Sequence, residues 1–358
     1  MVRISDIFKK HPQERHSRAE HKPKEEPPKE TIPPPPPQDA NSMHIAKIIK
    51  ETASDNARYD NLYLAGIQLI KEILTGTEQS KPADLDRTRA WIENITESLF
   101  FNDKEFLRLF YEYASENYMY THMVNTAIMS AEIGLGLGYN KSQLNEVGLA
   151  GFLHDIGMAK VGNLQMQERR LTEAEYSRIK EHPVYGADIL SGIKGVSEPV
   201  IYVARQEHER VNGTGYPRGL KDGEISEYAR IVMIADVYEA LTHNRPYRKK
   251  ISAHDAIKEL ISSHPLFDSA ILKVLINKLG IYPLSSWVQL NSNDIGKVII
   301  NNNEFPLRPV VHILFDSTGR RLREPQIVNL SKQFNLFIKR ALGYEDLASE
   351  IKERLEGS

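Results

Sequence analysis

The chain has 358 residues, of which 41% are hydrophobic, and its formal net charge is -2. Its length exceeds the ~100–200 residues of one domain, which predicts two or three folded units. The near-neutral charge provides no overall basic field and excludes a binder of long nucleic acid, so local charge must meet any nucleotide ligand. The absence of cysteine excludes disulfides, thiolate metal sites and cysteine nucleophiles, which leaves His, Asp and Glu as metal ligands.

No stretch approaches the ~20 apolar residues of a membrane-spanning helix, and residues 1–10 contain no apolar signal segment. We therefore expect a soluble, cytoplasmic protein. Residues 1–42 are rich in Pro, Lys and Glu, with a run of prolines at 33–37, and have too few apolar residues for a core. We predict a disordered arm there, whose residues 1–10 either fray or dock as a short helix on a protein partner.

Helical patterns occupy most of the chain after this arm. Over residues 43–117, apolar residues such as Ile67, Ile70 and Leu74 recur at helical spacing, which predicts an N-terminal helical region. This apolar stripe is a buried face or, as the alternative, the seam of a homodimer. Helical patterns continue over 118–283, where one polar, glycine-rich loop at 212–223 interrupts them.

The pattern changes after Pro283. Runs at 286–290, 297–300 and 309–314 alternate or are rich in β-branched residues, and short polar turns separate them. They predict a small antiparallel β appendage over 284–358, closed by a helix near 345–355. The predicted fold class is therefore mainly α, a helical bundle followed by a β-rich appendage.

The pair His154-Asp155 directly follows an apolar helical segment at 144–153 and precedes Gly157, which can end that helix. An unpaired Asp at the inner end of such a helix is unfavourable, whereas a divalent cation would compensate its charge and use the imidazole as well. From this pair alone, a capped helix end with a hydrogen-bonded histidine is the alternative.

Further histidines and carboxylates in the same helical region give this pair its context. The order His122, then His154-Asp155, then Asp236 resembles the HD phosphohydrolase superfamily. The segment Gln206-Glu207-His208-Glu209, with Asn212-Gly213-Thr214-Gly215-Tyr216-Pro217 after it, resembles the signature of the HD-GYP family. With Lys180-Glu181-His182-Pro183 upstream, this resemblance covers about residues 118–252, and it implies an HD-type helical bundle over 118–283.

The resemblance implies a centre of two divalent metal ions, iron or manganese, with magnesium as an alternative. His154 and Asp155 would form its catalytic pair. The implied ligands of one ion are His122, His154, Asp155 and Asp236, and those of the other are Asp155, His182, His208 and Glu207.

Two departures from the family bear on this centre. Members often carry two histidines where this chain has Glu207-His208, so a carboxylate replaces one imidazole. Members with three metals resemble one another in a glutamate one helical turn before the first histidine. Tyr118 stands in that place and is a poor ligand, so we expect two metal ions rather than three.

By the same resemblance, the substrate is cyclic di-GMP, opened to linear pGpG and on to GMP. Gly213 and Gly215 permit unusual backbone angles and Pro217 fixes the loop exit, so we expect the ring of Tyr216 to project and stack on a base. A structural turn with a packed tyrosine is the alternative. The residues implied to contact the substrate are Gly215, Tyr216, Pro217, Arg245 and Arg248, the arginines through its phosphate.

The lysine that often follows the His-Asp-Ile-Gly run in the family is Met158 here, and Lys160 is not assumed to replace it. One phosphate contact is therefore in doubt. Two other functions stay open: a catalytically silent receptor for cyclic di-GMP, and a hydrolase of another cyclic dinucleotide.

Overall fold

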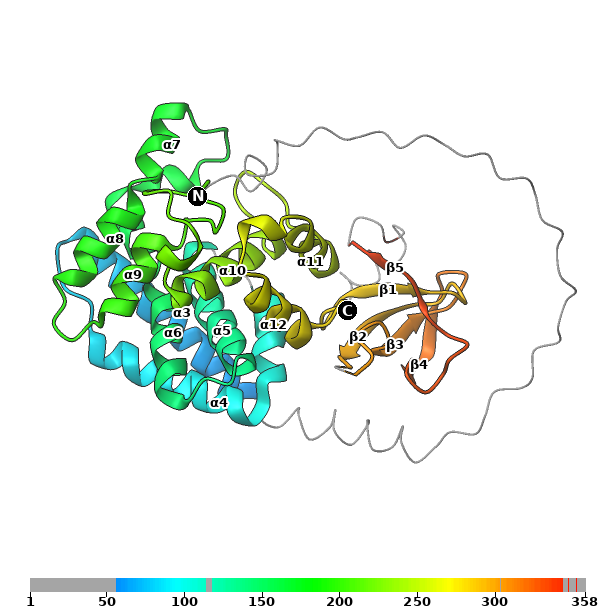
Figure 1. Ribbon diagram of the computed structural model, residues 1–358. Coiled ribbons are helices and arrows are strands. Elements are labelled where there is room, and N and C mark those ends of the chain that lie inside the picture. The colour runs from blue at the N-terminus through cyan, green and yellow to red at the C-terminus, as the bar shows by residue number, and fades with distance from the viewer. Residues whose placement is uncertain (1–55, 114–117, 303, 344–346, 348–351, 353–358) are drawn as a thin grey trace, which may run out of the picture.

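The computed structural model describes residues 56–113, 118–302, 304–343, 347 and 352. The arm predicted at 1–42 lies outside the described residues, as does most of the helix predicted near 345–355. Among the described residues, the chain forms a body of helices followed by one antiparallel five-stranded sheet (Figure 1). This arrangement confirms the predicted fold class. None of the described helices combines the length and apolar character needed to cross a membrane.

Two long helices form the N-terminal helical region, α3 (Asn56–Glu78) and α4 (Leu85–Glu112). The backbone N–H of Arg87 donates to the Asp84 side chain, which caps α4 at its start. A Cβ at Gly66 of α3 would lie 2.3 Å from the Trp91 ring, so glycine allows the two helices to approach closely. The stripe residues Leu69, Ile70, Ile73 and Leu74 are buried in a core that extends into the following helices.

The central helices of the body are α5 (Tyr118–Gly136), α6 (Lys141–Leu153), α9 (Glu198–Gln206) and α10 (Glu227–Thr242). Residues 121–134 of α5 and 231–242 of α10 are all buried, so these helices are enclosed on every side. Their polar side chains must therefore find partners inside the protein.

Further helices surround these four. They are η1 (Ile156–Lys160), η2 (Asn163–Met166), α7 (Glu173–Ile179), α8 (His182–Ser191), η3 (Asp222–Glu224), α11 (Ala253–Ser262), η4 (His264–Leu266) and α12 (Ser269–Leu279). The predicted loop at 212–223 contains only the start of η3 and an isolated bridge between Asn212 and Lys221.

The appendage has strand order β4-β3-β2-β1-β5, with all neighbours antiparallel. The three runs predicted from the sequence correspond to β1 (Trp287–Leu290), β2 (Ile295–Ile300) and β3 (Val310–Phe315). The sequence did not predict β4 (Arg321–Asn329) or β5 (Ile338–Leu342). Both are edge strands. β4 is largely exposed and contains Pro325, and β5 has the sequence Ile-Lys-Arg-Ala-Leu, so neither strand shows a clear alternation of apolar residues.

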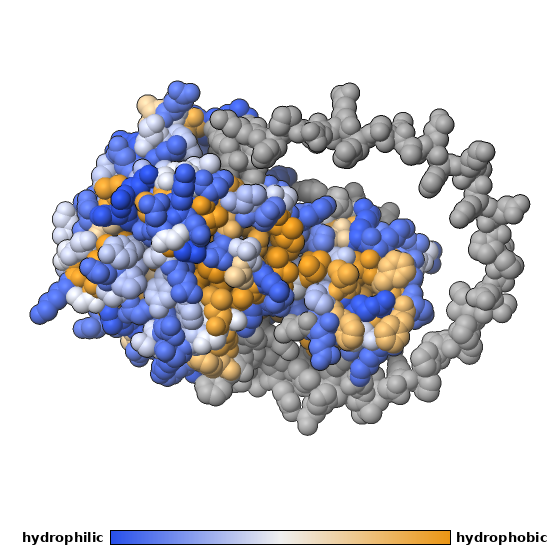
Figure 2. Space-filling model, in the orientation of Figure 1, coloured by the Kyte–Doolittle hydropathy of each residue, from blue (hydrophilic) through white to orange (hydrophobic). Residues whose placement is uncertain are grey.

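The sheet has a hydrophobic core of its own, separate from that of the helices. Its members include Val288, Val298, Val311 and Ile313. Asn301 after β2 donates to the Leu279 carbonyl at the end of α12, and His254 stacks on Tyr282, which joins the appendage to the helical body. Hydrophobic side chains also lie on the outer face of the appendage, where Figure 2 shows a patch over the strands.

We expect Gly157→Ala to lower the free energy of unfolding by roughly 1–3 kcal/mol. A Cβ at Gly157 would lie 2.0 Å from the His182 carbonyl oxygen and 2.5 Å from the Gly186 nitrogen, so the backbone of α8 would have to move. Denaturant unfolding measures this change. Gly223→Ala is the matched control, because nothing lies within 4 Å of a Cβ there. Equal stability of the two variants would contradict the close approach.

Candidate metal centre

Seven side chains predicted to bind metal meet at one place inside the helical body. His122 comes from α5 and Asp236 from α10. The others lie at helix ends: His154 caps α6, His182 begins α8 and Glu207 caps α9. All seven are buried: His122, His154, Asp155, His182, Glu207, His208 and Asp236. Helix ends and adjoining turns therefore bring residues from five segments of the chain together.

One group of ligand atoms gathers around His122. Atoms of His122, His154 and Asp155 all lie within 4.8 Å of one another. The Nε2 atom of His122 is 3.2 Å from His154 Nε2, 3.5 Å from Asp155 Oδ2 and 3.3 Å from Asp236 Oδ1. Asp236 thus borders this group, as the sequence predicts.

A second group consists of Asp155, His182, Glu207 and His208, whose ligand atoms also lie within 4.8 Å of one another. The Nε2 atom of His182 is 3.1 Å from Asp155 Oδ1 and 3.3 Å from Glu207 Oε1. Asp155 belongs to both groups, with Oδ2 near His122 and Oδ1 near His182. Its carboxylate therefore lies between them.

The hydrogen bonds of these residues suit a cation. His154 Nδ1 donates to the Gly151 carbonyl at 2.8 Å and His182 Nδ1 to the Ile179 carbonyl at 2.7 Å, which leaves both Nε2 lone pairs facing the group. Glu207 Oε2 and His208 Nδ1 are buried without a hydrogen-bond partner among the described residues. Buried acceptors without donors are unfavourable unless a cation satisfies them. This His/Asp/Glu cluster is compatible with a divalent metal site.

The electrostatics of the carboxylates agree with this view. Burial opposes the charged form of Asp155, but the imidazoles of His154, His122 and His182 outweigh it and hold the pKa of Asp155 well below its usual range. Burial raises the pKa of Glu207, and the neighbouring charge of Asp155 adds to this effect. The surroundings of Glu207 therefore oppose its charged form, which a nearby cation would favour.

A further carboxylate, Glu239, lies behind His122 and was not singled out from the sequence. Its Oε2 accepts hydrogen bonds from His122 Nδ1 and from Arg245 Nη2, both at 2.5 Å. Burial opposes its charge, yet Arg245 and His243 hold the pKa of Glu239 well below its usual range. The available signal was the spacing, because Glu239 follows Asp236 by one helical turn on the same face.

The helical body and the appendage each match a known family. The HD domain family matches residues 84–271, which is more than half of the chain. The chain belongs to the HD domain family. Residues 287–350 match a KOW domain associated with the HD domain.

Among curated proteins, a cyclic di-GMP phosphodiesterase of Pseudomonas aeruginosa is 32% identical over 242 residues, covering 67% of this chain and 58% of the relative. The cyclic di-GMP phosphodiesterase PdeB of Borreliella burgdorferi is 31% identical, covering 56% of this chain and 53% of the relative. A 3'3'-cGAMP-specific phosphodiesterase of Vibrio cholerae is 32% identical over 48% of this chain and 41% of its own length. The chain thus spans less than two thirds of each relative.

A solved structure supports the fold. An HDG"Y"P protein from Bdellovibrio bacteriovorus superposes with a TM-score of 0.52 and 19% identity, covering 62% of this chain and 71% of that chain. At this identity the likeness concerns the fold alone.

The glycine-rich loop of the HD domain differs in part from expectation. Gly213 has φ +81°, as predicted, but Gly215 is not in the left-handed region. Gly215 is needed for space, because a Cβ there would lie 2.4 Å from the backbone of Glu209. Pro217 is exposed at the loop exit.

Tyr216 does not project freely from this loop. Its backbone N–H donates to the His208 carbonyl at 3.0 Å, and its ring stacks on the His208 imidazole with centroids 4.8 Å apart. The hydroxyl is buried without a partner among the described residues, and Lys180 Nζ lies 5.3 Å from the ring centroid. The backbone hydrogen bond to His208 is the physical reason that the ring lies on the His208 imidazole instead of projecting.

Glu209 holds the loop in place. Its buried carboxylate accepts from the backbone N–H groups of Arg218 at 2.8 Å and Leu220 at 2.9 Å. Glu209 therefore serves the loop rather than the metal group, although it stands next to His208 in the sequence.

The two arginines predicted to contact phosphate have different surroundings. Arg245 is buried; Nη2 is bound to Glu239, while Nε and Nη1 have no partner among the described residues. Arg248 donates to the backbone carbonyls of Ala240 and Lys249. Its guanidinium is thus engaged by backbone carbonyls, and its contact with the substrate phosphate stays a prediction.

The departures at Tyr118 and Met158 have structural counterparts. The hydroxyl of Tyr118 donates to the Gln165 carbonyl at 3.2 Å, and the Arg245 guanidinium lies 4.6 Å from its ring centroid. Met158 is buried and Lys160 is exposed.

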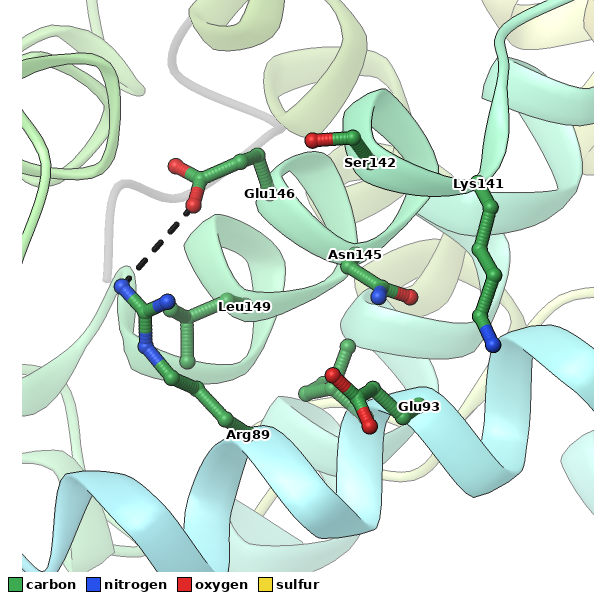
Figure 3. Close-up of a pocket in the computed structure, with 8 residues that line it drawn as sticks. Arg89, Glu93, Lys141, Ser142, Asn145, Glu146 and Leu149 are labelled. Carbon is green, nitrogen blue, oxygen red and sulfur yellow. Dashed lines mark ion pairs between the residues drawn. The ribbon is translucent and has the colours of Figure 1, made fainter.

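A separate open pocket of about 410 Å³ lies between α4 and α6 (Figure 3). Arg89 and Glu146 face each other across it, 3.9 Å apart, with Glu93 and Lys141 farther along. It contains none of the predicted site residues, and its polar, mixed-charge lining offers no set of metal ligands. The buried cluster is therefore the candidate site.

We expect Glu209→Ala to destabilise the loop, at a cost of about 1–3 kcal/mol, because the buried N–H of Leu220 and the part-buried N–H of Arg218 lose a charged acceptor. Hydrogen exchange should become faster at the amides of Arg218 and Leu220, and denaturant unfolding should report the loss. Glu224→Ala is the matched control, since that exposed carboxylate accepts from the single backbone N–H of Lys221. Unchanged exchange in Glu209→Ala would refute this role.

Proposed function

We propose that this chain is a metal-dependent phosphodiesterase that hydrolyses cyclic di-GMP to linear pGpG and on to GMP in bacterial second-messenger signalling. The observation that carries the proposal is the position of Asp155, a buried carboxylate between two groups of ligand-capable side chains. Two-metal centres of this kind suit phosphodiester hydrolysis. Several relatives are named as cyclic di-GMP phosphodiesterases, which supports the same substrate.

The proposal assigns a metal-holding role to each ligand. His122, His154, Asp155 and Asp236 would hold one ion, and Asp155, His182, Glu207 and His208 the other. Iron or manganese suits this mixed set of nitrogen and oxygen donors, with magnesium as the alternative. When bound, two such ions supply a nucleophile at neutral pH and stabilise charge on the phosphate oxygens. The hydrogen bonds from the Nδ1 atoms of His154 and His182 to main-chain carbonyls keep the Nε2 atoms directed to the centre.

Arg245 is the proposed phosphate contact. Its Nε and Nη1 atoms are buried without partners, and its Nη2 lies 3.0 Å from His122 Nδ1, so the guanidinium is beside the centre. A forked guanidinium suits a phosphate. We propose that Arg248 instead holds the turn that carries Arg245, because their backbones exchange hydrogen bonds at 2.8 and 3.1 Å. Tyr216, with Gly215 and Pro217, would border the substrate beside His208.

We also propose a location and partners for the protein. Because the proposed substrate is a soluble nucleotide, we propose that the enzyme acts in the cytoplasm. Exposed apolar side chains on the N-terminal helices, Leu64 of α3 and Phe100 of α4, support a homodimer through these helices. A protein partner for the arm at 1–42 rests on its composition alone.

The proposed function predicts that the protein purified without oxygen and loaded with Fe(II) or Mn(II) cleaves cyclic di-GMP and holds about two metal ions per chain. Asp155→Ala should lose both metal and hydrolysis, because one carboxylate serves both groups. Asp188→Ala, at an exposed carboxylate of α8, is the control. Elemental analysis and chromatography of the products measure the two outcomes.

Two results would redirect the proposal. Tight binding of cyclic di-GMP by metal-loaded protein without cleavage would indicate a silent receptor. Faster cleavage of 3'3'-cGAMP would indicate a hydrolase of that hybrid dinucleotide, the substrate named for the Vibrio cholerae relative.

A separate prediction concerns the role of Glu207 as a metal ligand. Glu207→Ala should reduce metal content and hydrolysis together, whereas Glu207→His should retain much of both, since imidazole is also a ligand. The loss of a negative charge in Glu207→His should lower the pKa of the nucleophile, so the rate should reach its plateau at lower pH. Glu198→Ala, at an exposed residue of the same helix, controls for effects on α9. Unchanged metal content in Glu207→Ala would show that Glu207 is not a ligand.

A further inference from the structure

Glu239 connects the candidate metal centre to its surroundings. Besides His122 and Arg245, its carboxylate lies near Asn125 Nδ2, 3.4 Å from Oε1, and His243 Nδ1, 3.2 Å from Oε1. Glu239 is fully enclosed, at 1% exposure. A buried carboxylate with this many partners fixes the orientation of each of them.

One route from this carboxylate leads into the N-terminal helices. The hydroxyl of Tyr63 in α3 donates to Asn125 Oδ1 at 2.7 Å, and both side chains are completely buried. On the other side, His243 Nε2 lies 2.6 Å from the carbonyl oxygen of Phe110 in α4. Both N-terminal helices therefore contribute to the environment of Glu239.

The bond from Tyr63 anchors the Asn125 amide from the side opposite Glu239. The hydroxyl donates to Asn125 Oδ1, while the amide N–H₂ donates to the Glu239 carboxylate. Without that hydroxyl, the buried Asn125 Oδ1 loses its donor from α3 and the amide is held less firmly. Glu239 would then have a less well-fixed donor and hold the His122 ring less firmly.

We infer that Tyr63 is a positioning residue for His122, acting through Asn125 and Glu239, and that α3 thereby sets the metal affinity of the His122 group. The inference rests on the proposed metal centre. It does not extend to the second group, since His182 is oriented separately by the Ile179 carbonyl. Loss of the Tyr63 hydroxyl therefore affects one of the two metal-binding steps.

The test compares Tyr63→Phe with Tyr59→Phe in the full chain. Tyr59 lies one turn earlier on the same helix, is 7% exposed and packs edge-on against Phe106, away from the route to Glu239. Mn²⁺ binding is measured by competition with a chelator, and the unfolding temperature of each metal-free variant reports any general loss of structure. We expect Tyr63→Phe to weaken one Mn²⁺-binding step about 2- to 10-fold and to leave the other unchanged.

A second variant tests the intermediate step. Glu239→Gln removes the charged acceptor of His122 and should weaken the same step by roughly 10- to 100-fold. Wild-type affinity of both steps in Tyr63→Phe would overturn the inference, as would equal weakening in Tyr63→Phe and Tyr59→Phe. If the unaltered chain binds no Mn²⁺, the proposed metal centre itself fails, which is distinguishable from failure of the Tyr63 role.

Discussion

The rest of the helical body depends on one constraint, the burial of carboxylates and imidazoles inside an apolar core. Asp155 and its neighbours are almost fully removed from water, and the charged form of a buried carboxylate is costly unless opposite charge or hydrogen bonds compensate it. The imidazoles provide part of that compensation, and Glu207 Oε2, which has no hydrogen-bond donor among the described residues, is compatible with a bound cation. His154, His182 and Glu207 stand at helix ends, where a turn can aim a side chain inward, whereas His122 and Asp236 lie within helices that are buried on every side.

A layer of groups behind the ligand-capable side chains holds these side chains in place. Glu239 orients His122, main-chain carbonyls orient His154 and His182, and Glu209 fixes the glycine-rich loop. Arg245 participates in this layer through Glu239, and its Nε and Nη1 atoms are buried without hydrogen-bond partners among the described residues. If Arg245 contacts the phosphate as proposed, the Glu239 carboxylate orients both this contact and His122, and a change at Arg245 is expected to disturb both.

The N-terminal helices belong to this arrangement physically, because their apolar faces complete the core and Tyr63 reaches Asn125. The appendage stands apart in this respect, since its strands enclose a separate core and contact the helical body near α12. Metal positioning thus depends on the helices, including α3 and α4, and the appendage is free to serve another purpose.

The sequence by itself determined the helical body and three of the five strands, because periodicity is visible along the chain. The seven ligand-capable residues came from the resemblance of its His, Asp, Gly, Tyr and Pro motifs to a known family, and the structure brings these residues together. The sequence could not reveal β4 and β5, whose exposed edge positions carry little alternation. Only the tertiary structure placed the Tyr216 ring on His208, engaged Arg248 with backbone carbonyls and brought Tyr63, Asn125 and Glu239 behind His122. These relations join residues up to 117 positions apart, and such pairing is decided by how the helices pack rather than by any local pattern.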